Sequence, residues 1–183
     1  MRSKSHIFSI GHGNKSIEKF IQELKSFDVK YLIDIRSKPY SKFNPHFNKE
    51  MLKCYIEREN IVYIFMGDSL GGLPAETSCY TSGKVDYDKL KIKDFFVTSL
   101  LKLKIANDKG LNSTIMCSEG SPTECHRTKL IGVELQKMGI ELRHITDIGK
   151  EKTQNQVILE LTNGNGLINL FGEESFTSRK QYL

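Results

Sequence analysis

The chain has 183 residues and a formal net charge of +5, with 38% apolar and 27% charged residues. This length suits one domain, and the composition allows a globular core without forcing disorder. No apolar run reaches the roughly 18 residues that a membrane-spanning helix needs, and the first apolar run is too short for a signal peptide. We therefore expect a cytoplasmic protein with no membrane partner, whose modest positive charge permits an anionic ligand.

The first third of the chain alternates short apolar runs with amphipathic stretches. The run 6–10 predicts a strand that ends at Gly11, and 16–27 predicts a helix with Ser16 as its N-cap. Strand, helix and strand should then follow at 30–37, 49–60 and 61–65.

The middle of the chain begins with a long loop. Residues 66–88 are rich in Gly, Ser, Thr and Asp, and a loop of this length inside a compact domain is usually functional or mobile. The stretch 87–108 predicts a long helix, and 112–118 predicts a strand.

A helix start is indicated next by the sequence Ser121-Pro122-Thr123-Glu124. It reads as a capping box with proline at the first helical position, which would put Cys125 at the fourth. Gly139 should end this helix, and 140–145 should be the last strand of the sheet.

Strands that alternate with helices predict a parallel sheet with helices on both faces. With right-handed crossovers this is a Rossmann-like, three-layer α/β domain, which we expect over residues 1–148. Residues 149–183 differ in composition, with one plausible helix near 151–162 and then Asn- and Gly-rich chain. We expect this part to be an appendage and not a separate domain.

Polar residues gather after the predicted strands, where open α/β sheets bind their ligands. They form five groups: Gly11 to Asn14; Asp34 with Arg36; Gly67 to Gly72; Cys117 with Glu119; and Cys125 to Arg127. These segments should converge on one edge of the sheet and form one site.

Several of these groups suit an anion, and each has a structural alternative. Residues 11–14 could present backbone N–H groups to an anion or form only a tight turn. Asp34 and Arg36 point to one face of a strand, as ligand groups or as a structural ion pair. The loop 36–49 interleaves lysines with aromatic residues: Lys38, Lys42, Lys49, Tyr40, Phe43 and Phe47. These side chains could bind nucleic acid, or the aromatic residues could instead anchor the loop to the core.

Glu119 is the carboxylate best placed for catalysis. Near His126 and Arg127, it could act as a nucleophile or a general base, with His126 or Asp34 assisting. Arg36 and Arg127 would then hold the anionic part of the substrate.

The two thiols near Glu119, those of Cys117 and Cys125, are expected to be structural and not reactive. In the cytoplasm they should be reduced. A zinc site made of Cys117, Cys125 and His126 lacks an evident fourth ligand, although His12 is a candidate. We therefore expect no metal and no cofactor.

Three stretches together resemble a known family: 9–47, the sequence GDSLGG at 67–72, and 116–145. The chain resembles, from about residue 6 to 145, the bacterial and archaeal family catalogued as domain of unknown function 488. The resemblance implies a compact Rossmann-like domain and supplies no reaction. The family's signature positions here are Gly11, His12, Asp34, Arg36, Pro39, Ser41, Gly71, Gly72, Cys117, Glu119 and Cys125 to Arg127.

This pattern is consistent with three functions. The first is a hydrolase or glycosyl-transfer enzyme acting on a phosphorylated small molecule, nucleotide or nucleic-acid component. The alternative is a non-catalytic module that binds nucleotides or nucleic acid through the loop 36–49. A thiol or metal switch at Cys117 and Cys125 is a third, weaker reading.

Overall fold

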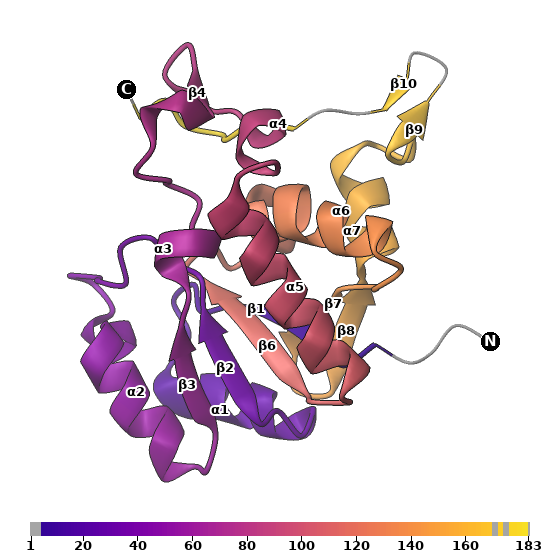
Figure 1. Cartoon of the computed structure of the whole chain (residues 1–183). Helices are drawn as coiled ribbons and strands as arrows, with labels where there is room; N and C mark the ends of the chain where they lie inside the picture. Colours follow the sequence, from indigo (N-terminus) through magenta and orange to yellow (C-terminus); the bar gives the residue numbers. More distant parts are fainter. Residues whose placement is uncertain (1–4, 170–171, 174–175, 183) are drawn as a thin grey trace.

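A six-stranded sheet forms the centre of the protein in the computed structural model, which describes residues 5–169, 172–173 and 176–182 (Figure 1). Its strands are β1 (Ile7–Gly11), β2 (Tyr31–Asp34), β3 (Val62–Phe65), β6 (Ser113–Cys117), β7 (Arg143–Asp147) and β8 (Lys150–Thr153). Their order in the sheet is β3-β2-β6-β1-β7-β8, and β8 at one edge is antiparallel to its neighbour. The other pairings are parallel.

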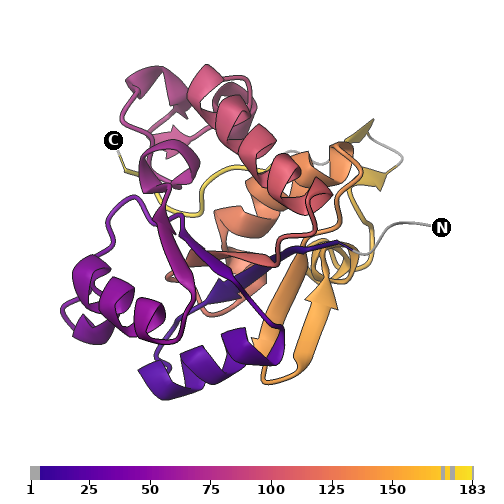
Figure 2. The ribbon, with the colours of Figure 1, turned by 60° about the horizontal axis from the view of Figure 1, so that its bottom comes forward.

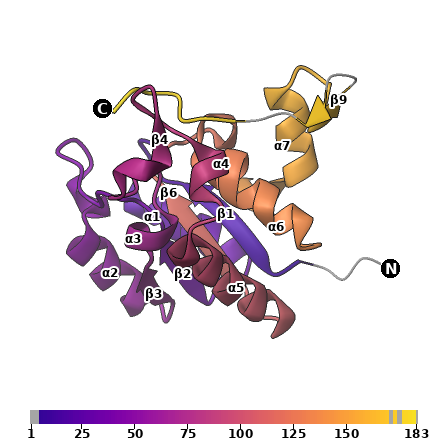
Figure 3. The same ribbon diagram turned by 45° about the horizontal axis from the view of Figure 1, so that its top comes forward.

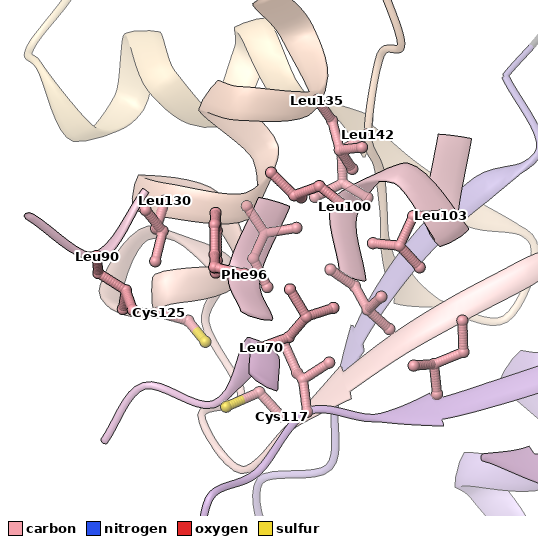
Figure 4. Close-up of a cluster of buried hydrophobic side chains, with 14 of the residues drawn as sticks. Leu70, Leu90, Phe96, Leu100, Leu103, Cys117, Cys125, Leu130, Leu135 and Leu142 are labelled. Carbon is pink, nitrogen blue, oxygen red and sulfur yellow. The ribbon is translucent and has the colours of Figure 1, made fainter. Parts of the chain in front are cut away.

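Helices cover both faces of this sheet (Figure 2). Helices α1 (Ile17–Ser26) and α2 (Lys49–Arg58) pack over one apolar cluster, which contains Phe20 and Leu52. On the other face, α5 (Asp94–Asp108) and α6 (Val133–Lys137) enclose a second cluster (Figure 4). The predicted three-layer α/β architecture is therefore confirmed. Among the described residues, no helix has the length and apolar character to span a membrane.

The chain leaves β1 and β6 toward opposite faces of the sheet. After β1 it enters α1, whereas after β6 it enters a π-helical stretch at Arg127–Gly132 and then α6. A crevice forms where neighbouring parallel strands diverge in this way, at their carboxyl ends. Gly11 and Cys117 end these two strands, and Glu119 follows β6.

Residues 66–108 differ from the prediction. The long loop contains α3 (Gly67–Leu70), a turn at Thr77–Cys79 and the hairpin β4 (Tyr80–Thr81) and β5 (Lys84–Val85). The predicted single helix is divided into α4 (Tyr87–Leu90) and α5. Asp86 caps α4, and the apolar stripe breaks at Ile92, which is 71% exposed.

The predicted helix start at Ser121 is wrong. The Ser121 hydroxyl bonds to the Thr123 hydroxyl, 2.8 Å away, and makes no cap. Pro122–Glu124 form only a 3-10 turn, and Cys125 is extended, with φ −111° and ψ 146°. Cys125 therefore lies ahead of the helix and not in its first turn. Gly139 does end α6, with a φ of +77°.

The tail is tied to the domain at several points. Strand β8 extends the sheet beyond residue 148, and α7 (Gln154–Leu161) begins with a capping box at Thr153. A short hairpin, β9 (Ile168–Asn169) and β10 (Gly172–Glu173), follows, and Thr177 pairs with Asp86. The tail thus returns to the segment after β5 (Figure 3).

A buried histidine links the tail to β1. His144 lies 2.6 Å from the Ser9 hydroxyl through Nδ1 and 2.8 Å from the Gln154 side-chain oxygen through Nε2. Gln154 in turn donates to the Thr128 carbonyl at 3.0 Å. Burial lowers the pKa of His144 to about 3, so the ring is neutral at pH 7.

We predict that His144 makes the protein acid-sensitive. Because its pKa is lower in the folded than in the unfolded chain, its contribution is complete above pH 6.5 and is lost as the pH falls toward 3. Urea denaturation should therefore show about 2 kcal/mol of stability lost to this group between pH 7 and pH 5. His144→Asn should be less stable at pH 7 but lose that much less on acidification, and equal losses in both proteins would contradict this account.

Candidate functional site

A small cleft opens at the carboxyl edge of the sheet. Its space of about 230 Å³ suits a small molecule or one unit of a larger one. It is lined by β6 and the residues after it, by the loops after β2 and α3, by α4 and by the tail: Arg36, Ser37, Lys38, Gly72, Leu73, Tyr87, Cys117, Ser118, Glu119, Glu124, His126, Ser178, Arg179, Lys180 and Tyr182.

The close approach of β1 and β6 forms the base of this region. The backbone N–H of His12 donates to the Cys117 carbonyl at 3.1 Å, and that of Gly13 donates to the Ser118 carbonyl at 3.0 Å. A Cβ atom on Gly11 would lie 1.9 Å from the Glu119 carbonyl oxygen, so only glycine fits. The N–H groups of His12 and Gly13 are therefore used in hydrogen bonds to the loop after β6 and are not available to bind an anion.

Arg127 holds the loop that carries Glu119. Its guanidinium donates to the carbonyls of Glu119 at 2.8 Å and Gly120 at 3.0 Å, and its side chain is fully buried. Arg127 therefore does not line the cleft, although the sequence suggests it as an anion ligand. Its role in this structure is to fix the backbone of residues 119–120.

Asp34 and Arg36 form a buried, bidentate pair. The carboxylate accepts from Nε at 2.9 Å and Nη2 at 2.7 Å of Arg36, and from the Tyr63 hydroxyl at 2.7 Å. Asp34 is fully buried behind Arg36 and does not reach the cleft. It fixes the guanidinium, which lines the cleft.

His12 supports the same guanidinium from the other side. Its Nδ1 donates to the Gly13 carbonyl at 2.9 Å, its ring stacks on Phe47, and its Nε2 lies 3.5 Å from Nη1 of Arg36. Burial lowers the pKa of His12 to about 4, so the neutral ring can accept a hydrogen bond there. His12 is a positioning group for Arg36.

His126 is oriented by the loop after α3. Its Nε2 donates to the Leu70 carbonyl at 3.0 Å, since a carbonyl can only accept. Gly72 packs on the ring, where a Cβ would lie 3.0 Å from Nδ1. The other nitrogen, Nδ1, lies 3.8 Å from the sulfur of Cys117 and 3.6 Å from that of Cys125.

The two thiols also face the carboxylate of Glu119. Its Oε2 accepts from the Cys117 thiol at 2.8 Å and lies 3.4 Å from the Cys125 sulfur. Burial would raise the pKa of Glu119, but hydrogen bonds from the Cys117 thiol and its own backbone N–H hold that pKa below the usual value. Glu119 is therefore an ionised carboxylate that faces both the thiols and the cleft.

The protonation of the other two groups follows from this arrangement. The hydrogen bond with Cys125, together with burial, raises the pKa of Cys117, so without a bound cation it stays a thiol. Burial would lower the pKa of His126, but the Cys117 sulfur and Glu119 carboxylate raise it above its usual value. Cys117, Cys125 and His126 are also the groups that could hold a metal ion.

The tail supplies part of the cleft, which sequence reasoning missed. Ser178 exchanges hydrogen bonds with the backbone of Val85, and this pairing carries Arg179, Lys180 and Tyr182 to the cleft rim. Arg179 forms an ion pair with Glu124 at 2.9 Å. No local pattern in the sequence indicates this docking, because its partners lie about 90 positions apart.

The predicted site residues therefore divide into two sets. Those that line the cleft are Arg36, Gly72, Cys117, Glu119 and His126. Those that lie behind or beside it are Gly11, His12, Asp34, Ser41, Gly71, Cys125 and Arg127. Within the second set, the Ser41 hydroxyl accepts from Asn44 N, and Gly71 packs against the Ser37 hydroxyl.

We predict that Arg36 stabilises the folded protein in addition to lining the cleft. Arg36→Met leaves the Asp34 carboxylate buried with only the Tyr63 hydroxyl and a backbone N–H, so urea denaturation should show a loss of about 3–5 kcal/mol. The double variant Asp34→Asn/Arg36→Met should recover part of that loss. If Arg36→Met unfolds at the same urea concentration as wild type, the Asp34–Arg36 pair contributes nothing to the free energy of unfolding.

Comparison with known proteins agrees with the motifs on which this site is built. The model of one family, described as Domain of unknown function DUF488, matches residues 16–133, which is more than half of the chain. Neither the curated proteins nor the solved structures include a match to the chain. The resemblance found in the sequence is confirmed, and the chain belongs to the DUF488 family.

Proposed function

We propose that the protein is an enzyme of the hydrolase or glycosyl-transfer type that acts on a phosphorylated small molecule, a nucleotide or a nucleic-acid component. The observation that carries the proposal is Glu119, an ionised carboxylate that lines a small cleft with a cationic rim. The proposal places the enzyme in the cytoplasm, where its thiols stay reduced.

The charges around the cleft support an anionic substrate. Arg36, Lys38, Arg179 and Lys180 face two carboxylates, those of Glu119 and Glu124. Glu124 is already paired with Arg179. Arg36 is held rigidly by Asp34 and His12, and a rigid guanidinium binds a phosphate oxygen with little loss of side-chain entropy.

Glu119 would perform the chemical step. A carboxylate gives no benefit to a protein that only binds anions, because it repels them. Beside a bound phosphate ester or glycoside it can attack the reacting atom or take a proton from water. Its backbone is fixed by Arg127 and its Oε2 by the Cys117 thiol, so the group is oriented before the substrate arrives.

A second function is supported by the loop after Arg36. Phe47 is buried and anchors this loop, but Tyr40 is 73% exposed and Phe43 is 89% exposed. Exposed aromatic rings beside Lys38 and Lys42 suit stacking on nucleic-acid bases. The protein would then be a non-catalytic module that binds nucleotides or nucleic acid.

We predict that Glu119→Gln separates catalysis from binding. The variant keeps the shape and removes the charge, so turnover should fall by roughly two orders of magnitude while the ligand binds as tightly as before or more tightly. Turnover and thermal shift on a library of nucleotides and phosphorylated compounds would measure both. Glu124→Gln, a change in the exposed carboxylate of the same cleft, should keep its turnover.

Full turnover by Glu119→Gln would eliminate the catalytic role of this carboxylate. If no compound in the library is turned over and single-stranded nucleic acid binds tightly, the binding module is the better description.

We predict that the exposed cation Lys38 contributes to substrate binding through charge. Lys38→Ala should weaken binding about two- to fivefold at low salt, and the effect should fade at about 1 M salt, where screening acts within about 3 Å. Lys42→Ala is the matched control in the same loop, since Lys42 does not line the cleft. Binding that depends on Lys42 and Phe43 but not on Lys38 would favour the nucleic-acid module.

A further inference from the structure

We propose that Cys117, Cys125 and His126 bind a zinc ion, with the carboxylate of Glu119 in the fourth position, next to the cleft. This site goes beyond the proposed reaction and does not depend on it. It differs from the expectation from the sequence, which is that no metal binds and that only His12 is a candidate for the fourth ligand.

The spacing of the two sulfurs and Nδ1 of His126 fits one tetrahedral ion, because these three donor atoms lie within 4.8 Å of one another, and the Glu119 carboxylate is adjacent to both sulfurs. Zinc binds sulfur at about 2.3 Å and nitrogen or oxygen at about 2.0–2.2 Å, so neighbouring donors around it lie about 3.3–3.8 Å apart. The two sulfur–Nδ1 distances are 3.8 and 3.6 Å, and Oε2 of Glu119 lies 3.4 Å from the Cys125 sulfur. The Cys117 sulfur and Oε2 are closer, at 2.8 Å, as suits a thiol hydrogen bond that the metal would replace.

His126 is oriented as a metal ligand. Its Nε2–H is bound by the Leu70 carbonyl, so once a metal displaces the proton on Nδ1, the lone pair of that nitrogen points toward the two sulfurs. Metal-bound histidines have this second hydrogen bond almost without exception. Gly72 leaves the ring the space to adopt this orientation, because a side chain there would displace it.

The charge of the surroundings also fits a bound ion. Two thiolates, one carboxylate and Zn²⁺ carry one net negative charge. Arg127 is buried beside them: its backbone N–H reaches the Cys125 sulfur, and its guanidinium binds two carbonyls. In the described part of the chain its partners include no carboxylate, and its Nε has no partner, so a net negative centre nearby would balance it.

The local backbone explains how distant residues meet. Cys117 ends β6, and Cys125 is held extended before the helix, so its sulfur turns back toward the strand end. Figure 4 shows both sulfur atoms at the same border of the apolar cluster. A disulfide would use only the two sulfurs and would leave Nδ1 of His126 and the Glu119 carboxylate without a function, which is why we favour a metal.

The test is metal binding by the full-length protein, purified under reducing conditions and freed of metal. We expect one equivalent of Zn²⁺ per chain in a chelator competition. Co²⁺ in its place should give the intense visible bands of a tetrahedral ion and the near-ultraviolet charge-transfer bands of cobalt–sulfur bonds. Wild-type protein alone can therefore refute the proposal, even if a ligand variant fails to fold.

Variants then assign the ligands. Loss of a group that only hydrogen-bonds to a metal ligand weakens metal binding by about 10–100-fold. Loss of a ligand itself should cost at least as much, so Cys117→Ser and Cys125→Ser should each weaken zinc binding by about 100-fold or more. Cys54→Ser, on exposed α2, and Cys79→Ser, in the core, are the matched controls and should bind as wild type does. Glu119→Gln should still bind one equivalent through its three remaining ligands, whether or not it has lost turnover.

Zinc binding below one equivalent, a cobalt spectrum without sulfur charge-transfer bands, or full affinity in Cys125→Ser would each overturn the proposal. So would a Cys117–Cys125 disulfide that forms readily while zinc is present, because it would show that the pair is a redox couple. A failed reaction assay with intact zinc binding would refute only the proposed function.

Discussion

The contact between the carboxyl ends of β1 and β6 is the constraint on which the site depends. Gly11 allows the Glu119 carbonyl to approach within a distance that no side chain would permit, and Arg127 binds that same carbonyl from inside the core. This arrangement fixes the backbone on which Cys117 and Glu119 are carried. The cleft opens beside this contact, between residues that follow β2, β6 and α3.

Two buried hydrogen-bond networks orient the polar groups around the cleft. Asp34, Tyr63 and His12 hold Arg36, while Leu70 and Gly72 hold His126. Most of these partners have no access to a ligand, yet they decide where the accessible groups point. The same division explains why residues of the family motif, such as Asp34 and Arg127, lie behind the cleft: they act on the site through the residues that they position.

Much of this could be predicted from the sequence, where the signal is local. Ser16 caps α1 by accepting from the Lys19 N–H, and Gly139 ends α6 with the positive φ that favours glycine. The alternation of strands and helices in the sequence correctly predicted the three-layer architecture. The capping box at Ser121 failed because long-range contacts dominate there: Cys125 is drawn to the sulfur–carboxylate cluster, and the helix starts only after it. The docking of residues 178–182 and the Leu70–His126 bond join distant segments, so no periodicity or spacing could indicate them.

Cys117, Glu119, Cys125 and His126 lie together at one corner of the cleft, and the proposed zinc ion would join them into a single centre. The most direct measurement is a crystal structure of protein grown with zinc, with diffraction recorded at the zinc absorption edge. We expect one anomalous peak per chain, within bonding distance of Sγ of Cys117, Sγ of Cys125 and Nδ1 of His126, with the carboxylate of Glu119 as the fourth ligand. A structure without such a peak, in which the two sulfurs are thiols or a disulfide, would contradict the proposal.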